Sequence, residues 1–134
     1  MCIRDRNEVT IICPDAEIGS QGSVDGKIYT VVDEQMLREK VANNEDVTCV
    51  CTSKVGDMGT LFEDAEGFNQ DISSWDTSKV TNMEGMFENA TSFNQNIGNW
   101  NTSNVTSMKW MFVRAINFNP VSYTHLTLPT ILRV

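Results

Sequence analysis

Apolar residues recur in the second half of the chain with a period of 25 residues. Residues 75–94 are identical to residues 100–119 at 11 of 20 positions, and residues 50–74 are identical to residues 75–99 at 12 of 25. A fixed period of this length is typical of proteins built from stacked repeats. We therefore predict a repeat array over 50–119, with units at 50–74, 75–99 and 100–119, the last of them truncated.

The spacing within one unit predicts its secondary structure. Thr81 and Glu84 could form a capping box at the start of a helix, and Ser78 is a rival N-cap. Residues 68–75 read as a turn followed by a short strand around Ile72. The helix is predicted because apolar residues three or four apart share one helix face, and here they are Val80, Met83, Met86, Phe87 and Ala90.

The predicted fold class is α/β, a solenoid of 25-residue helix-turn-strand units whose strands form a parallel sheet. Residues 7–49 are expected to form an N-terminal cap, because the first unit of a stack otherwise exposes its apolar face. The repeated apolar positions predict the core, which comprises Ile72, Trp75, Val80, Met83, Phe87, Ala90, Phe93, Trp100, Val105, Met108 and Phe112.

Two further sets of repeated residues have a structural and a functional interpretation. Asn69, Asn94 and Asn119 are predicted to form a buried ladder that satisfies backbone groups, and an exposed ligand-binding ladder is the alternative. Trp75 and Trp100 are predicted to pack inside the stack, although stacked rings could also bind sugars. In both cases we favour the structural interpretation.

Trp110 breaks the repeat. It stands where the preceding unit has Gly85, so it has no apolar counterpart in that unit. We therefore take Trp110 as a candidate for an exposed contact with a ligand.

The two ends of the chain read as translated sequencing adapter. Residues 1–6, MCIRDR, are encoded by the end of a common transposase adapter, and VSYTHLTLPT at 121–130 is encoded by its reverse complement. We expect residues 1–6 and 120–134 to be artefacts and the rest to be a fragment of a longer protein, and we exclude both ends from the sequence argument. His125 is the sole histidine, and it falls within the excluded part.

Charge and hydropathy limit the partners. The two excluded ends contain three of the ten basic residues and one of the eighteen acidic residues. The rest of the chain therefore has 7 basic and 17 acidic residues, a net charge of −10. Such a chain repels nucleic acid phosphates and anionic lipid, so neither is expected as a partner. No apolar run approaches the roughly 20 residues of a membrane helix, so no transmembrane segment is expected in this fragment.

Three cysteines remain between the excluded ends. Cys49 and Cys51 are two residues apart and cannot readily bond each other on a strand. A Cys13–Cys51 disulfide is preferred and Cys13–Cys49 is the rival, while three reduced, buried thiols are the alternative. Three cysteines without a histidine lack a fourth zinc ligand, so no metal site is predicted.

Catalytic chemistry is not expected from this sequence. Without histidine, acid–base work would rest on carboxylates, of which Asp57, Asp71 and Asp76 are the natural suspects, and they do not form a repeated acid pair. Neither a phosphate-binding glycine loop nor a calcium loop is present. We predict no enzyme activity and no cofactor; a carbohydrate-active enzyme on a β-solenoid is kept as a remote alternative.

The units WDTSKVTNMEGMF and WNTSNVTSMKWMF resemble the repeat of BspA-like leucine-rich-repeat bacterial surface proteins. The resemblance covers about 50–119 and is weakest in the first unit, where Val50 replaces the tryptophan. The preceding stretch is similar to the segment before such repeats, which implies a strand over 27–32 and a helix over 34–42. That helix would bury Met36, Leu37 and Val41.

The resemblance implies a leucine-rich-repeat-like fold and a secreted or surface-displayed bacterial protein. We expect a non-catalytic binding or adhesion module whose partner is an unidentified protein or glycan at the cell surface. A passive stalk or envelope scaffold that presents another domain is the alternative.

Overall fold

The computed structural model describes residues 2–119, so the predicted adapter segment at 120–134 lies outside the described residues. The N-terminal part holds a two-stranded antiparallel sheet and a three-stranded sheet with the order β3-β4-β5. In the second sheet β3 and β4 form an antiparallel hairpin, and β5 adds parallel to β4. The strands are β1 Ile3–Arg4, β2 Ile11–Ile12, β3 Gln21–Val24, β4 Lys27–Val31 and β5 Val50–Cys51. The first six residues, taken above as adapter, supply β1.

Helix α1, Glu34–Ala42, connects β4 to β5. Asp33 caps it, because the Asp33 side chain accepts a hydrogen bond of 2.8 Å from the backbone N–H of Met36. Leu37 is buried, and Met36 and Val41 pack against the core from the same helix. The strand and the helix expected before the repeats are therefore confirmed.

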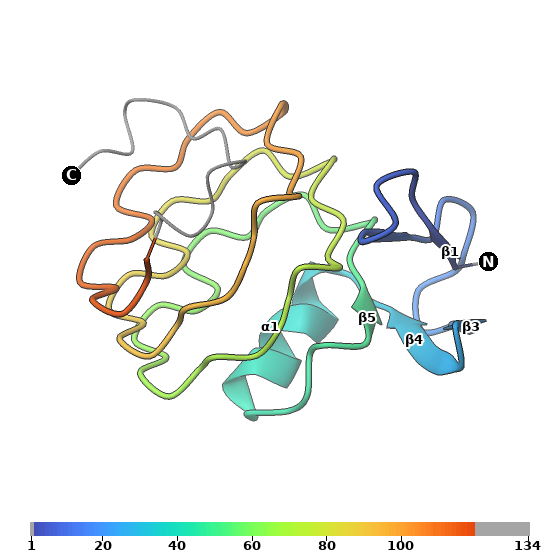
Figure 1. The fold of residues 1–134 in the computed structure, drawn as a ribbon, viewed down its shortest axis with the longest axis horizontal. Coiled ribbons are helices and arrows are strands. Elements are labelled where there is room, and N and C mark those ends of the chain that lie inside the picture. Colours follow the sequence, from blue (N-terminus) through green and yellow to red (C-terminus); the bar gives the residue numbers. More distant parts are fainter. Residues whose placement is uncertain (1, 120–134) are drawn as a thin grey trace.

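The predicted fold class is wrong. Within residues 2–119, α1 is the one helix, and residues 52–119 contain neither the helix nor the strand that was predicted for each unit. Figure 1 shows this part of the chain as a series of irregular loops beside α1. A leucine-rich-repeat-like solenoid of helix-turn-strand units with a parallel sheet is not what this sequence forms; the regular structure is one helix and two small sheets.

The hydrogen bonds of residues 83–90 explain why no helix forms there. The backbone N–H groups of Met83, Gly85 and Phe87 donate to carbonyl groups 24 residues further along the chain, of Ser107, Lys109 and Met111. The intervening N–H groups of Met86 and Glu88 donate to the residue three before them. Alternate amides thus serve neighbouring segments and tight turns, so the i−4 bonds of a helix cannot form. Apolar residues three or four apart fit this chain of turns as well as they fit a helix.

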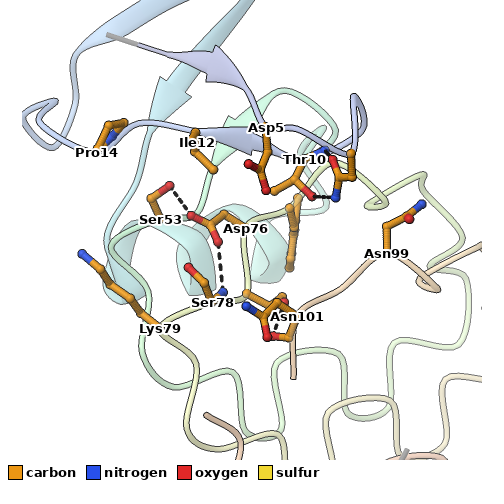
Figure 2. A pocket seen from close by; sticks show the side chains of 13 residues that line it. Asp5, Thr10, Ile12, Pro14, Ser53, Asp76, Ser78, Lys79, Asn99 and Asn101 are labelled. Atoms are coloured by element: carbon orange, nitrogen blue, oxygen red, sulfur yellow. Dashed lines mark hydrogen bonds between the residues drawn. The ribbon is translucent and has the colours of Figure 1, made fainter. Parts of the chain in front are cut away.

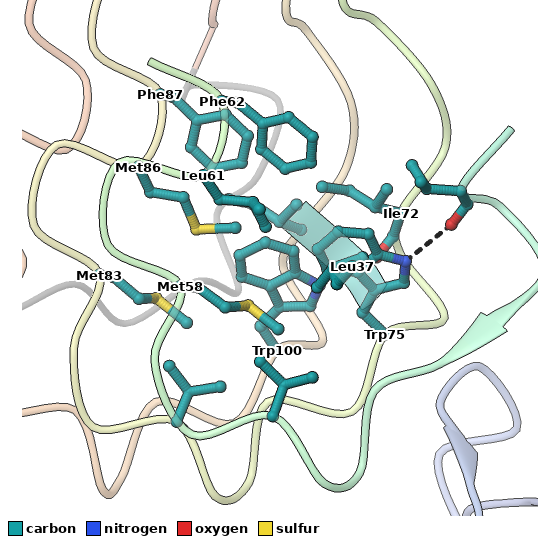
Figure 3. Close-up of a cluster of buried hydrophobic side chains, with 14 of the residues drawn as sticks. Leu37, Met58, Leu61, Phe62, Ile72, Trp75, Met83, Met86, Phe87 and Trp100 are labelled. Atoms are coloured by element: carbon teal, nitrogen blue, oxygen red, sulfur yellow. Dashed lines mark hydrogen bonds between the residues drawn. The ribbon is translucent and has the colours of Figure 1, made fainter. Parts of the chain in front are cut away.

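Buried apolar residues nevertheless occupy the space enclosed by these loops (Figure 3). Among the predicted core residues, Val105 and Phe112 are partly buried, and the rest are buried. Residues 25 apart contact each other: the rings of Trp75 and Trp100 stack with centroids 6.3 Å apart, and those of Phe62 and Phe87 with centroids 5.4 Å apart. Each indole N–H of Trp75 and Trp100 donates to a backbone carbonyl, so these two rings are packing residues rather than exposed platforms.

The three repeated asparagines lie on the surface. The Asn69 side chain accepts a hydrogen bond of 2.8 Å from the backbone N–H of Asn94, and Asn94 accepts one of 3.1 Å from that of Asn119. The ladder is therefore present, but the expected burial is wrong, because all three residues are exposed. Residues 68–70 and their equivalents follow the turns at the surface, where a side-chain amide can satisfy the next segment without being covered.

Candidate functional site

The three carboxylates considered for catalysis lie in different places. Asp76 lines a cavity of about 350 Å³ between the N-terminal part and the loops. Asp57 lines a second cavity beside α1, and Asp71 a third beside β4. The fold thus does not bring these carboxylates together into the pair that glycoside hydrolysis uses.

The cavity at Asp76 is a junction held by hydrogen bonds (Figure 2). Asp76 is 7 % exposed, and its carboxylate accepts hydrogen bonds from the Ser53 hydroxyl at 2.7 Å and from the Ser78 backbone N–H at 3.0 Å. The Ser53 hydroxyl in turn accepts from the backbone N–H of Cys13 at 3.0 Å. The chain of bonds ties the N-terminal part to the loops, so we interpret Asp76 as a structural residue.

Replacing Asp76 with alanine is expected to lower the free energy of unfolding by about 1–3 kcal/mol, because the buried Ser53 hydroxyl loses its acceptor. Asp71→Ala is a matched control: Asp71 likewise accepts from the backbone N–H two residues later, that of Ser73, but it is exposed. Its loss is expected to cost less than about 1 kcal/mol. Urea unfolding of both variants measures the difference, and equal losses would show that Asp76 is no junction residue.

The third cavity, beside β4, contains Tyr29, Cys49 and Asp71. Burial raises the pKa of the Tyr29 phenol, and the nearby Cys49 adds to the rise. Asp46, close by in sequence, has its pKa lowered by hydrogen bonds from the side chain and backbone of Thr48. None of these shifts brings a group toward neutral pH, where a general acid or base works best.

The cysteines form one disulfide. Cys13 and Cys51 are bonded, with their Cα atoms 6.4 Å apart, and Cys49 is free and partly buried. The Cys2 thiol lies within 4.8 Å of both bonded sulfur atoms. Within residues 2–119 these three sulfur atoms form the one cluster with metal-binding spacing, but the disulfide uses two of them. The residues present therefore fit a disulfide better than a metal centre.

Trp110 borders a groove of about 440 Å³ on the face beside α1. Trp110 is 52 % exposed, as the break in the repeat predicts for a contact residue. We call this cavity the Trp110 groove. Its other lining residues are Arg38, Asp57, Gly59, Thr60, Glu63, Asn82, Glu84, Gly85 and Glu88.

The floor of the Trp110 groove is a column of residues 25 apart: Thr60, Gly85 and Trp110. All three have positive φ, at 56°, 61° and 61°. Glycine adopts this conformation without strain, whereas a residue with a large side chain costs free energy there. Gly85 is buried, and because it has no side chain, the Thr60 methyl group and a carboxylate oxygen of Glu88 lie close over it.

Carboxylates lie close to Gly85. A Cβ atom added to Gly85 would lie 3.2 Å from a carboxylate oxygen of Glu88 and 3.9 Å from one of Glu63. The two oxygens are therefore within about 7 Å of each other, close enough for their charges to repel. Glu63 was not among the residues predicted from the sequence; the signal that could have identified it is its place 25 residues before Glu88, in the same column.

Arg38, on α1, is the one basic residue that lines the groove, and acidic neighbours already surround it. Its guanidinium lies 3.7 Å from a carboxylate oxygen of Asp57 and 3.8 Å from one of Glu34. Glu63, Glu84 and Glu88 take part in none of the ion pairs found among residues 2–119. The groove thus combines an exposed indole ring with unneutralised carboxylates.

A family model described as "Mycoplasma protein of unknown function, DUF285" matches residues 32–125. The chain belongs to this family. The match to the DUF285 family includes α1, all the repeat units and every residue that lines the Trp110 groove. No curated protein and no solved structure matches the chain.

Among residues 2–119 the structure has no helix long and apolar enough to cross a membrane, as the sequence predicted for this part of the chain.

Proposed function

We propose that this member of the DUF285 family is a non-catalytic bacterial surface or secreted protein that acts as a binding or adhesion module. The observation that carries the proposal is the exposed Trp110 at the border of a groove. A half-exposed tryptophan in a strained backbone conformation costs stability, and a binding role gives a reason for that cost. Tryptophan is also the residue type most enriched at the energetic centres of protein interfaces.

Two further observations support display outside the cytoplasm. The repeat units resemble those of BspA-like surface proteins, although the leucine-rich-repeat fold implied by that resemblance is not part of the proposal. The Cys13–Cys51 disulfide is of the kind that persists in an oxidising compartment. The proposed partner is a protein or glycan at the cell surface. Residues far from the groove would serve to hold the groove in position.

The rival to this proposal is a passive stalk that presents another domain. Polar side chains at equivalent positions change from unit to unit, as when the exposed Lys79 becomes Asn104 and the partly buried Glu84 becomes Lys109. Such variation suits a recognition surface, and drift on a spacer would also produce it. Trp110 separates the two roles, because a spacer gains nothing from an exposed tryptophan.

The proposal is tested by attachment assays with the purified chain. Fluorescently labelled protein is expected to bind saturably to a panel of immobilised extracellular-matrix proteins and glycans, or to intact host cells, and unlabelled protein is expected to compete. A panel without saturable, competed binding would favour the stalk. A protein unfolded in urea and returned to buffer without its disulfide serves as the control for non-specific adhesion.

A further inference from the structure

We propose that the Trp110 groove binds a basic peptide segment of a partner protein, and that a lysine or arginine side chain of the segment lies between Trp110, Glu63 and Glu88. This inference rests on the proposed function and names the chemical class of the partner. Neither the family description nor the resemblance assigns such a site.

The charge of the groove favours a cationic occupant. Four carboxylates line the groove against one guanidinium, and the carboxylates beside Gly85 have no basic partner among residues 2–119. The whole chain carries a net charge of −8. A cationic side chain placed between Glu63 and Glu88 would relieve their mutual repulsion, whereas a neutral sugar would leave it unchanged.

The Trp110 ring favours the same kind of occupant. The ammonium group of Lys109 already lies over this ring, 4.3 Å from its centroid. The ring therefore accepts a cation in this environment, as tryptophan does more strongly than the other aromatic residues. Lys109 is not among the residues that line the groove, and it takes part in none of the ion pairs found among residues 2–119, so it does not neutralise the carboxylates of the groove.

The contacts predict a weak site. Exposed ion pairs and one cation–π contact give dissociation constants on the order of 1 mM for a short peptide. A surface protein with many copies could still attach firmly through such sites, because simultaneous weak contacts raise the effective affinity.

The test is an NMR titration of the full chain with a capped tri-lysine peptide. The three indole N–H signals separate the sites: those of Trp75 and Trp100 are hydrogen-bonded inside the protein, whereas Trp110 is exposed. We expect saturable shifts of the Trp110 indole and of the Gly85 amide, with the other two indoles unchanged. The same peptide with acetylated lysines is expected to give no shifts.

Two variants and a matched control test the residues. Trp110→Gly puts a glycine at position 110, where the backbone has the same φ as at Gly85. The variant is therefore expected to fold, and to bind the tri-lysine peptide at least about fivefold more weakly. The pair Glu63→Gln and Glu88→Gln is expected to weaken binding about tenfold. The control pair Asp15→Asn and Glu17→Gln removes the same charge from exposed residues of the N-terminal part, and it is expected to change affinity less than twofold.

Equal losses in the groove pair and the control pair would overturn the proposal, because binding would then follow net charge alone. Equal binding of the acetylated peptide would also overturn it, as would shifts at Trp110 with an uncharged oligosaccharide but not with the peptide. Failure of the proposed function is separate. If the tri-lysine peptide binds as described while the attachment assay is negative, the peptide site is supported and the adhesion function is contradicted. If attachment occurs and Trp110→Gly leaves it unchanged, the adhesion function is supported and the peptide site in the groove is contradicted.

Discussion

Phe87→Ala is expected to lower the free energy of unfolding by about 3–5 kcal/mol, measured by urea denaturation. Phe87 is fully buried and lies at the centre of the aromatic cluster. Its ring centroid lies 4.1 Å from that of Phe93, 5.4 Å from that of Phe62 and 5.6 Å from that of Phe112. The substitution removes contacts with the segments before and after it, and the close-packed surroundings can fill the cavity only in part.

Phe112→Ala is the matched control for this variant. Phe112 occupies the equivalent position one unit later, but it is only partly buried. The same deletion there leaves a shallower cavity that water can enter, so a loss of about half that of Phe87→Ala is expected. A loss below about 1 kcal/mol for Phe87→Ala, or equal losses for the two variants, would mean that the aromatic cluster is not the centre of stability.

The amino-acid sequence predicts the contacts between segments better than it predicts the backbone. Residues spaced by 25 were expected to meet in the core, and Trp75 with Trp100 and Phe62 with Phe87 do meet. Such a period shows which side chains share an environment, but not which backbone conformation brings them together. The three-to-four spacing of Val80, Met83 and Phe87 is common to a helix and to a chain of three-residue turns, and the structure has the turns.

Residues in the left-handed backbone region distinguish this chain of turns from a helix. Thr60, Gly85 and Trp110 share a positive φ, and so do Asp64, Asn89 and Arg114 four residues after each of them. Two such residues in each unit exclude a continuous helix. Gly85, Asn89 and Asp64 are residue types that favour this conformation, whereas Thr60, Trp110 and Arg114 are not, so the last unit gives no warning of it.

The candidate site could be predicted only in part for a similar reason. Trp110 was identifiable because it replaces Gly85, and its exposure follows from the absence of an apolar partner in that column. Glu84 and Glu88 are four residues apart, so the helix expected over 80–90 would also have placed them on one face, but this pattern does not show that they border one groove with Trp110. Arg38 comes from α1, which no periodicity connects to the groove.

Reducing the Cys13–Cys51 disulfide is expected to lower the free energy of unfolding by about 4 kcal/mol. The bond spans 38 residues, and closing a loop of that length removes roughly this much conformational free energy from the unfolded chain in the chain-entropy model. The bond also connects β5 to the segment that follows β2, and this part of the chain is tied to the loops as well by the Ser53–Asp76 chain of hydrogen bonds and by the bond from the Ile11 N–H to the Ser74 carbonyl. Urea unfolding with and without a reducing agent measures the effect.

The choice of variant matters because a third thiol is close. In Cys13→Ala alone, the Cys2 thiol could bond Cys51, since the three sulfur atoms lie within 4.8 Å of one another. Burial raises the pKa of Cys2 and so slows its attack, but it does not prevent it. The double variant Cys13→Ala and Cys51→Ala removes both partners and is expected to be as unstable in oxidising buffer as the reduced protein. Cys49→Ala is the control and should lose less than about 1 kcal/mol, because Cys49 is unbonded and only partly buried. If a reducing agent leaves the unfolding midpoint of the unaltered chain unchanged, the disulfide does not form in solution. The disulfide would then no longer support display in an oxidising compartment.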